Sequence, residues 1–224
     1  METIVVFDMD GVLAEVSESY RQSIVETVAH FTGQRIELQS IQDYKNQGGW
    51  NNDWALSQKI AGDLGVAVPY DEVVRKFNQI FLGQNGDGLI LKERWIPEDG
   101  LFDRLRSACD LAIFTGRDRY ELDLTLRRFV PRVPFSPVIC AEDVERGKPA
   151  PDGLHAIQRA RPGAKLWFLG DTVDDARSAR AAGVPFVGIA AGMESRNDGL
   201  LELFRNEGAV AIIDNVNQIE RVLA

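Results

Sequence analysis

The chain has 224 residues, of which 45% are hydrophobic and 26% charged, an ordinary composition for a globular protein of one large or two small domains. Its net charge of −9 disfavours nucleic acid and anionic membranes as partners, because phosphate-rich surfaces favour basic proteins. No apolar stretch reaches the roughly 20 residues of a membrane span, and charged residues by position 8 argue against a signal peptide. With two cysteines too few for a disulfide framework, we expect a cytoplasmic protein with buried thiols.

The first predicted element is a buried parallel strand over residues 3–7, a short run rich in Val and Ile. It ends in two carboxylates, Asp8 and Asp10, followed by Gly11. Side chains alternate along a strand, so the two acids would project the same way in an extended chain, but Gly11 indicates that a turn begins at Asp10. The carboxyl end of a parallel strand is where open α/β sheets bind ligands.

Helical periodicity follows the first strand. Ser17 could cap a helix that runs to about Phe31 and ends at Gly33. Apolar residues spaced by three and four predict further helices near 53–64 and 71–82, and residues 84–88 are typical of a loop.

From residue 96 onwards the pattern alternates between short apolar runs and helical segments. The candidate strands are 110–115, 136–140, 165–170, 185–190 and 209–213, and a last helix is expected at 215–223. Such alternation indicates an α/β fold with a parallel sheet flanked by helices. We expect a Rossmann-like core (1–14 and 96–224) interrupted by a small α-helical cap domain (15–95).

Three more short motifs carry functional groups: Thr115-Gly116-Arg117, Gly147-Lys148-Pro149 and the acidic segment 170–175. With Asp8-Met9-Asp10-Gly11-Val12, they resemble the four ordered motifs of the haloacid dehalogenase superfamily of hydrolases, in members with a helical cap inserted after the first motif. Those motifs are Asp-x-Asp-Gly-Thr/Val, a Thr or Ser ending the next core strand, Gly-Lys-Pro-x-Pro-Asp and Gly-Asp-x-x-x-Asp. A single Asp-x-Asp motif is weak evidence for this family, but all four motifs in this order are specific evidence for it.

The resemblance implies a phosphatase chemistry for these residues. Asp8 would be the nucleophile that forms an aspartyl-phosphate, and Asp10 the general acid that protonates the leaving alcohol and then the base that activates water. Lys148 would neutralise charge on the transferring phosphoryl group. Thr115 and the Gly116 amide would contact a phosphate oxygen, although Thr115 could also be a helix cap.

The same resemblance implies Mg²⁺ as cofactor, a hard cation that takes oxygen ligands. Asp8, Asp171 and the backbone carbonyl of Asp10 would hold it, with Asp175 close behind. Asp174 has no counterpart in the family motif and can be read as a charge at a helix start. Arg117 could reach substrate or pair with Asp118 or Glu121.

The resemblance also implies that cap residues choose the leaving group. The segment Lys45–Trp54, expected to be a loop between cap helices, is dense in amides, Gly and Trp, which suits a polar or ring-bearing ligand. The candidates for substrate contact are Arg21, Lys45, Trp50, Asn51 and Asn52. In the alternative reading, Asn51 to Asp53 cap the next helix and the Trp residues anchor the cap.

These observations predict a Mg²⁺-dependent phosphatase acting on a small phosphorylated metabolite, with oligomeric state left open. A sugar-phosphate mutase of the same superfamily is a weaker alternative, because Tyr20 stands where such mutases typically carry a His. A phosphonate hydrolase would use a cap lysine, for which Lys45 is available. A phospho-Asp signalling module is disfavoured by the insert of about 80 residues, and a non-catalytic binding module has no feature in its favour.

Overall fold

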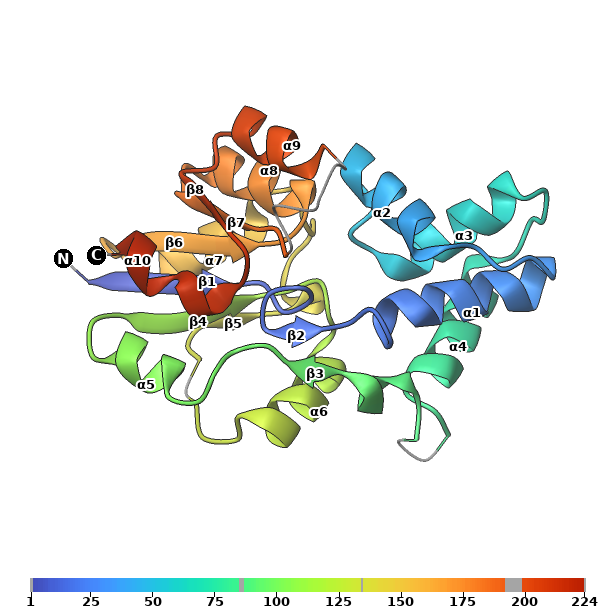
Figure 1. Ribbon diagram of the computed structural model, residues 1–224, viewed down its shortest axis with the longest axis horizontal. Helices are drawn as coiled ribbons and strands as arrows, with labels where there is room; N and C mark the ends of the chain where they lie inside the picture. The colour runs from blue at the N-terminus through green and yellow to red at the C-terminus, as the bar shows by residue number, and fades with distance from the viewer. Residues whose placement is uncertain (1, 85–86, 134, 192–198, 224) are drawn as a thin grey trace. The chain divides into compact units, whose positions relative to one another are not determined.

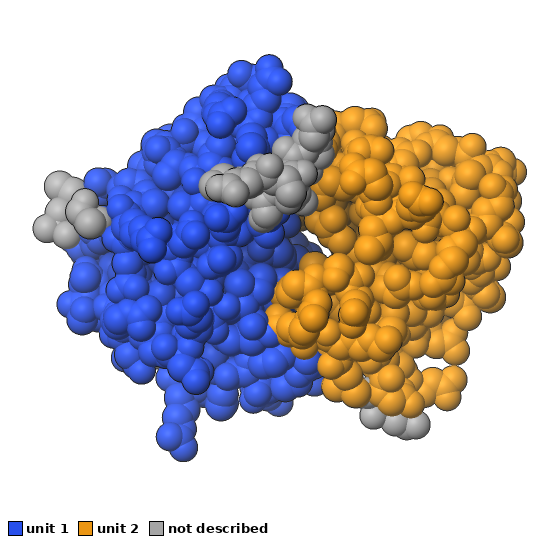
Figure 2. Space-filling view, viewed as in Figure 1, with its two compact units in different colours: residues 1–14, 95–224 blue, residues 15–94 orange. Residues whose placement is uncertain are grey.

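The computed structural model describes residues 2–84, 87–133, 135–191 and 199–223. Of the loop expected at 84–88, Asn85 and Gly86 lie outside the described residues. The chain forms two compact units (Figure 2). Unit 1 contains Met1–Ala14 and Trp95–Ala224, and unit 2 contains Glu15–Arg94.

Unit 1 is built on a six-stranded sheet with the strand order β5-β4-β1-β6-β7-β8. Every pairing between neighbouring strands is parallel. The strands are β1 (Thr3–Phe7), β4 (Asp110–Phe114), β5 (Val138–Ile139), β6 (Lys165–Gly170), β7 (Phe186–Ile189) and β8 (Ala211–Ile213). This sheet confirms the predicted Rossmann-like α/β class. A separate pair, β2 (Ala14–Glu15) and β3 (Arg94–Trp95), lies where the chain passes between the units.

Helices cover both faces of this sheet (Figure 1). They are α5 (Leu101–Arg106), α6 (Arg119–Phe129), α7 (Asp152–Ala160), α8 (Val173–Ala182), α9 (Leu200–Asn206) and α10 (Glu220–Leu223), with 3₁₀ turns η2 (Ala141–Asp143) and η3 (Val216–Gln218). The continuous helix predicted at 215–223 is therefore wrong: the segment is η3 followed by α10.

The alternation of side chains along β1 divides the core between the two faces. Ile4 and Val6 belong to a cluster that also contains Ile157 of α7 and Ala179 of α8. On the other face the ring of Phe7 packs edge-on against Phe102 of α5, with centroids 6.0 Å apart. A strand buried on both faces explains why residues 3–7 form an unbroken apolar run.

Unit 2 is helical. It consists of α1 (Tyr20–Thr32), α2 (Leu38–Gln47), α3 (Asp53–Asp63), α4 (Tyr70–Phe81) and the 3₁₀ turn η1 (Leu89–Lys92). Gly33 ends α1 with a left-handed φ of 71°, as predicted. The predicted cap at Ser17 is wrong, because the helix begins at Tyr20 and the Ser17 amide donates to Glu15 instead.

Buried aromatic rings hold unit 2 together. Tyr20 of α1 lies against Phe81 of α4, with ring centroids 4.0 Å apart, and both contact Phe77. Within the described part of the chain, no helix has the length and apolar character needed to cross a membrane.

Candidate active site

The functional motifs of unit 1 follow three neighbouring strands at the point where each strand ends. Asp8 follows β1, Thr115 follows β4 and Asp171 follows β6. Because β1 lies between β4 and β6 and all three run parallel, their carboxyl ends share one edge of the sheet. The chain crosses from one side of β1 to the other between β5 and β6, and such a crossing is where α/β sheets open a ligand site.

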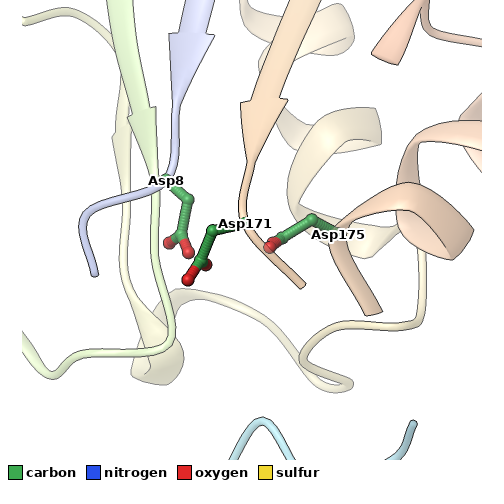
Figure 3. A group of neighbouring side chains, drawn as sticks. All are labelled: Asp8, Asp171 and Asp175. Carbon is green, nitrogen blue, oxygen red and sulfur yellow. The ribbon is translucent and has the colours of Figure 1, made fainter. Parts of the chain in front are cut away.

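Three carboxylates form a group at this edge (Figure 3). One oxygen from each of Asp8, Asp171 and Asp175 lies within 4.8 Å of the others. An all-oxygen donor set of this kind fits a hard divalent cation such as Mg²⁺. The side chain of Asp10 is not in this group. The metal contact predicted for Asp10 is through its backbone carbonyl and stays a prediction.

A single ammonium group lies among these carboxylates. Lys148 Nζ is 2.8 Å from Asp8 Oδ1 and 2.7 Å from Asp175 Oδ1, and its side chain is 1% exposed. Burial alone would lower the pKa of Lys148, but the charges of Asp175 and Asp8 outweigh it and raise that pKa. The lysine is therefore fully charged at neutral pH.

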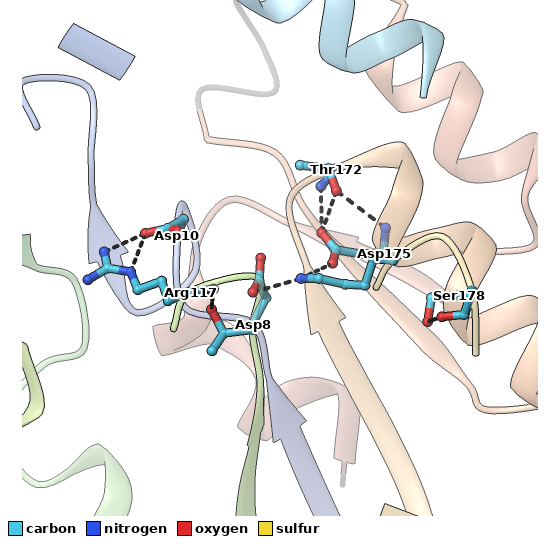
Figure 4. A network of polar contacts seen from close by, with 9 residues as sticks. Asp8, Asp10, Arg117, Thr172, Asp175 and Ser178 are labelled. Carbon is cyan, nitrogen blue, oxygen red and sulfur yellow. Dashed lines mark hydrogen bonds and ion pairs between the residues drawn. The ribbon is translucent and has the colours of Figure 1, made fainter. Parts of the chain in front are cut away.

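The segment that carries Lys148 is tied to helix α8. Ser178 of α8 donates its hydroxyl to the backbone carbonyl of Ala150 at 2.9 Å (Figure 4). At the start of the same helix, Asp175 Oδ2 accepts from the Thr172 amide at 3.0 Å and from the Thr172 hydroxyl at 2.6 Å. These bonds make a capping box, so the geometry that begins α8 also fixes Asp175 beside Lys148.

The pKa of Asp8 reflects its burial and the nearby like charges. Its pKa is raised well above its usual range, first by burial and then by the nearby carboxylates of Asp175, Asp10 and Asp171, against the opposing effect of Lys148. A bound divalent cation would favour the ionised forms instead, so this arrangement suits a metal site.

The side chain of Asp10 is paired with Arg117, a contact that was not among the roles considered for Arg117 from the sequence. Arg117 donates from Nε to Asp10 Oδ1 at 3.0 Å and from NH2 to the same oxygen at 2.5 Å (Figure 4). Its backbone amide donates to Thr115 Oγ1 at 3.2 Å. Thr115 is buried, Gly116 is exposed, and α6 begins directly after this turn with Asp118 as its N-cap.

In unit 2 the expected loop is shorter than predicted. Helix α2 extends to Gln47 and α3 begins at Asp53, so Lys45 is helical and the loop covers 48–52. Lys45 Nζ forms an ion pair with Asp53 Oδ1 at 2.8 Å, and the two side chains are 12% and 13% exposed. The pair joins the helices on either side of the loop.

The other unit 2 candidates also have structural contacts. Asn52 is the N-cap of α3, since its side chain accepts from the Ala55 amide at 2.9 Å. Trp50 lies edge-on to Tyr44 with centroids 6.3 Å apart, and Arg21 donates to Gln42 at 2.9 Å. Asn51 is half-buried. Capping by Asn52, one of the two alternatives, is therefore present.

Sequence patterns did not single out three further residues around the site. Thr125, Thr172 and Ser178 each place a hydroxyl on a functional residue or its loop, and all three are buried. The spacing of Thr172 and Asp175 matches a capping box and could have identified Thr172. Buried hydroxyls within helices are common, and no local signal distinguishes Thr125 or Ser178. Asp174 is buried in the first turn of α8, the helix start expected for it.

The fold and the acidic site define a Rossmann-like α/β protein with a helical insert and a candidate metal site. A sequence profile described as haloacid dehalogenase-like hydrolase matches residues 3–183, and the chain belongs to this family. An imidazoleglycerol-phosphate dehydratase from Phytophthora nicotianae is 33% identical over 191 residues. That match covers 81% of this chain but only 42% of the relative, so the chain spans less than half the length of the curated relative that it matches.

Solved structures share the fold. A predicted phosphoglycolate phosphatase from Haemophilus somnus superimposes with a TM-score of 0.77 at 17% identity, covering 100% of this chain and 98% of that one. A subfamily IA hydrolase of the same superfamily from Geobacter sulfurreducens gives a TM-score of 0.65 at 23% identity, covering 100% and 97%. At these identities the likeness concerns the fold alone.

Proposed function

We propose that this chain is a Mg²⁺-dependent phosphatase that hydrolyses a small phosphorylated metabolite through a phosphorylated Asp8. The observation that best supports this proposal is the environment of the Asp8 carboxylate. It is buried, lies 2.8 Å from the Lys148 ammonium group and is grouped with Asp171. An anionic nucleophile can approach a phosphate ester only where cations offset the repulsion between them.

The reaction has two steps. In the first, a carboxylate oxygen of Asp8 attacks phosphorus, the bond between phosphorus and the ester oxygen breaks, and Asp10 gives its proton to that oxygen. In the second, water loses a proton to Asp10 and attacks phosphorus, which restores Asp8 and releases inorganic phosphate. Lys148, the Thr115 hydroxyl and the Gly116 amide stabilise the phosphoryl oxygens.

The carboxylates of Asp8 and Asp171 would hold Mg²⁺, with the Asp10 carbonyl as a further ligand and Asp175 nearby. When bound, the ion offsets the charge of the phosphate and the nucleophile. This assignment is tested by calorimetric titration of Mg²⁺ into the protein and into an Asp171→Asn variant, for which we expect weaker binding.

Two alternatives within the superfamily have less support. Tyr20, at the position where mutases typically carry a His, is 6% exposed and packs on Phe81 in the core of unit 2. A phosphonate hydrolase needs a neutral cap amine, whereas Lys45 forms an ion pair with Asp53. These contacts favour structural roles for both residues within unit 2.

The names of similar proteins suggest candidate leaving groups. The relative from Phytophthora nicotianae is named for an imidazole-bearing phosphate ester, and the Haemophilus somnus structure for phosphoglycolate. We therefore place imidazoleglycerol phosphate, histidinol phosphate, phosphoglycolate and sugar phosphates first among candidate substrates. Each is a small phosphate monoester.

The deciding experiment is phosphate release from this panel, with Mg²⁺ and with a chelator, for the wild type and for Asp10→Ala. One preferred substrate whose hydrolysis needs metal and Asp10 supports the proposal. Conversion of a sugar phosphate to an isomer without phosphate release would instead support the mutase, and no reaction with any ester would reject both.

We further propose that the loop 48–52 of unit 2 selects the leaving group. Trp50→Ala and Asn51→Ala should change the preference among metabolites more than the rate with p-nitrophenyl phosphate. Equal losses on all substrates would give the loop a structural role instead. Asn52 is unsuitable for this test because its loss also removes the cap of α3.

A further inference from the structure

Arg117 is a buried guanidinium group that donates hydrogen bonds to side chains of unit 1. Its side chain is 1% exposed, and burying such a charge is unfavourable unless hydrogen bonds and an opposite charge compensate it. Nε and NH2 donate to Asp10 Oδ1, and NH1 donates to Thr125 Oγ1 at 2.8 Å. We call Asp10, Arg117 and Thr125 the Arg117 clamp.

The clamp holds the Asp10 carboxyl group by one end. In the common bidentate geometry, two arginine nitrogens bind the two oxygens of a carboxylate. Here both nitrogens donate to Oδ1, so Oδ2 receives neither of these bonds. The Asp10 side chain remains 30% exposed while its partner is almost fully buried. One carboxyl oxygen is thus fixed, and the other lies outside the clamp.

Thr125 fixes the other side of the guanidinium. It lies on α6, and its hydroxyl is within 3.3 Å of the backbone carbonyl of Glu121, to which it can donate. The plane of the guanidinium is therefore set by both α6 and the turn after β1, on which Asp10 lies. Arg117 also belongs to the turn that carries Thr115, since its amide donates to the Thr115 hydroxyl.

We infer that Arg117 is a positioning residue for Asp10, holding Oδ1 so that Oδ2 carries the proton exchanged with the leaving group and with water. This inference rests on the proposed function. In this inference Arg117 holds the proton-transfer group Asp10 and does not contact the substrate, which was one of the two roles considered for it from the sequence. A proton donor must be held in a narrow range of orientations to act in the transition state.

The test compares two leaving groups. An alkyl phosphate needs a proton on its departing oxygen, whereas p-nitrophenolate departs without one. General acid catalysis contributes about 10²–10⁴-fold to a rate. Hydrolysis of the phosphorylated Asp8 is common to both substrates, so the readout is kcat/KM, which reports the reaction up to phosphoryl transfer. We expect Arg117→Met to lower kcat/KM for an alkyl phosphate by about 10²-fold, with a change of no more than about 3-fold for p-nitrophenyl phosphate. Thr125→Val, which spares the Arg117–Asp10 pair, should show the same selectivity with a smaller loss.

Arg119→Met is the matched control. Arg119 lies two residues further along and pairs with Asp143, but its side chain is 43% exposed and outside the clamp. We expect this variant to keep the wild-type ratio of the two rates. Arg117→Lys, which keeps the charge, should recover part of the alkyl phosphate activity.

Three outcomes would overturn the inference. Equal losses on both leaving groups would place Arg117 on the phosphoryl group, and a faster alkyl reaction in Arg117→Met would mean that the clamp holds Asp10 away from substrate. The third comes from a double-mutant cycle of Asp10→Asn and Arg117→Met in urea unfolding, which needs no activity. Additive losses of unfolding free energy in that cycle would reject the clamp itself. If the cycle instead shows coupling but the wild-type protein hydrolyses no ester, the clamp stands, and the proposed function and its proton-transfer step are rejected.

Discussion

Gly11 provides a prediction about how closely the site is packed. This residue has a φ of +74°, and a Cβ built on it would lie 2.0 Å from Asp171 Oδ2 and 2.4 Å from Asp171 Cγ. Gly183, at the end of α8 in the same unit, has a similar φ of +66°, but among the described residues no atom beyond its chain neighbours and its own helix backbone lies within 4 Å of its Cβ position. The two glycines therefore share a backbone conformation and differ in whether a carboxylate must move.

We expect Gly11→Ala and Gly183→Ala each to lose about 1–2 kcal/mol of unfolding free energy, because an L residue is strained in the left-handed region. Gly11→Ala should also weaken Mg²⁺ binding by about 10–100-fold, the usual cost of disturbing a group that orients a metal ligand. Urea unfolding in chelator isolates the backbone effect, since bound metal would itself stabilise the fold. Calorimetric titration then measures Mg²⁺ affinity.

The Mg²⁺ affinities of the two variants show whether the position of Asp171 matters for metal binding. Mg²⁺ affinity unchanged in both would show that Asp171 need not occupy its observed position to bind metal. Equal weakening in both would mean that the effect comes from lost stability and not from the displaced carboxylate. A loss of affinity confined to Gly11→Ala is the expected result.

Three other changes test separate parts of the site. Asp8→Asn should fold normally and lose all measurable turnover, and intact-protein mass spectrometry should no longer detect a phosphorylated enzyme during reaction; retained turnover would remove the covalent mechanism. Lys148→Met leaves two buried carboxylates without their shared ammonium group, so we expect a loss of about 3–5 kcal/mol of unfolding free energy in chelator and a smaller loss in Mg²⁺; equal losses in the two conditions would argue against a cation beside Lys148. Burial raises the pKa of Cys140 to about 12, so its reactive thiolate forms only at high pH, and labelling at pH 8 should be about 10³-fold slower in the native protein than in urea. Similar labelling rates would mean that this thiol is accessible and ionised.

The fold class followed from local patterns because a parallel sheet buried on both faces leaves a strong signal. The strands of unit 1 are short apolar runs separated by helical segments, and their order places Asp8 and Asp171 at one edge. Helix α2 was missed for a physical reason. Its sequence is mostly polar, and among its residues only Ile41 and Gln42 are buried, so no apolar stripe marked it.

Long-range pairing of side chains was not predictable in the same way. Asp10 and Arg117 are 107 positions apart, and the pattern around Arg117 offered nearer acids as partners. The buried pairing depends on where the turns after β1 and β4 meet, which is a property of the folded sheet. The contact between Thr125 and Arg117 was missed for the same reason. It depends on the direction in which α6 leaves the turn after β4.

The three grouped carboxylates differ in how far their charges are compensated by neighbouring groups. Both oxygens of Asp175 already have partners, Lys148 on Oδ1 and the Thr172 amide and hydroxyl on Oδ2. Its charge is therefore the best compensated, and its main contribution is to hold Lys148 beside Asp8. Asp8 shares that one ammonium group and feels three further carboxylates. The excess negative charge thus falls on Asp8, where the proposed reaction needs a divalent cation and an electrophilic phosphorus.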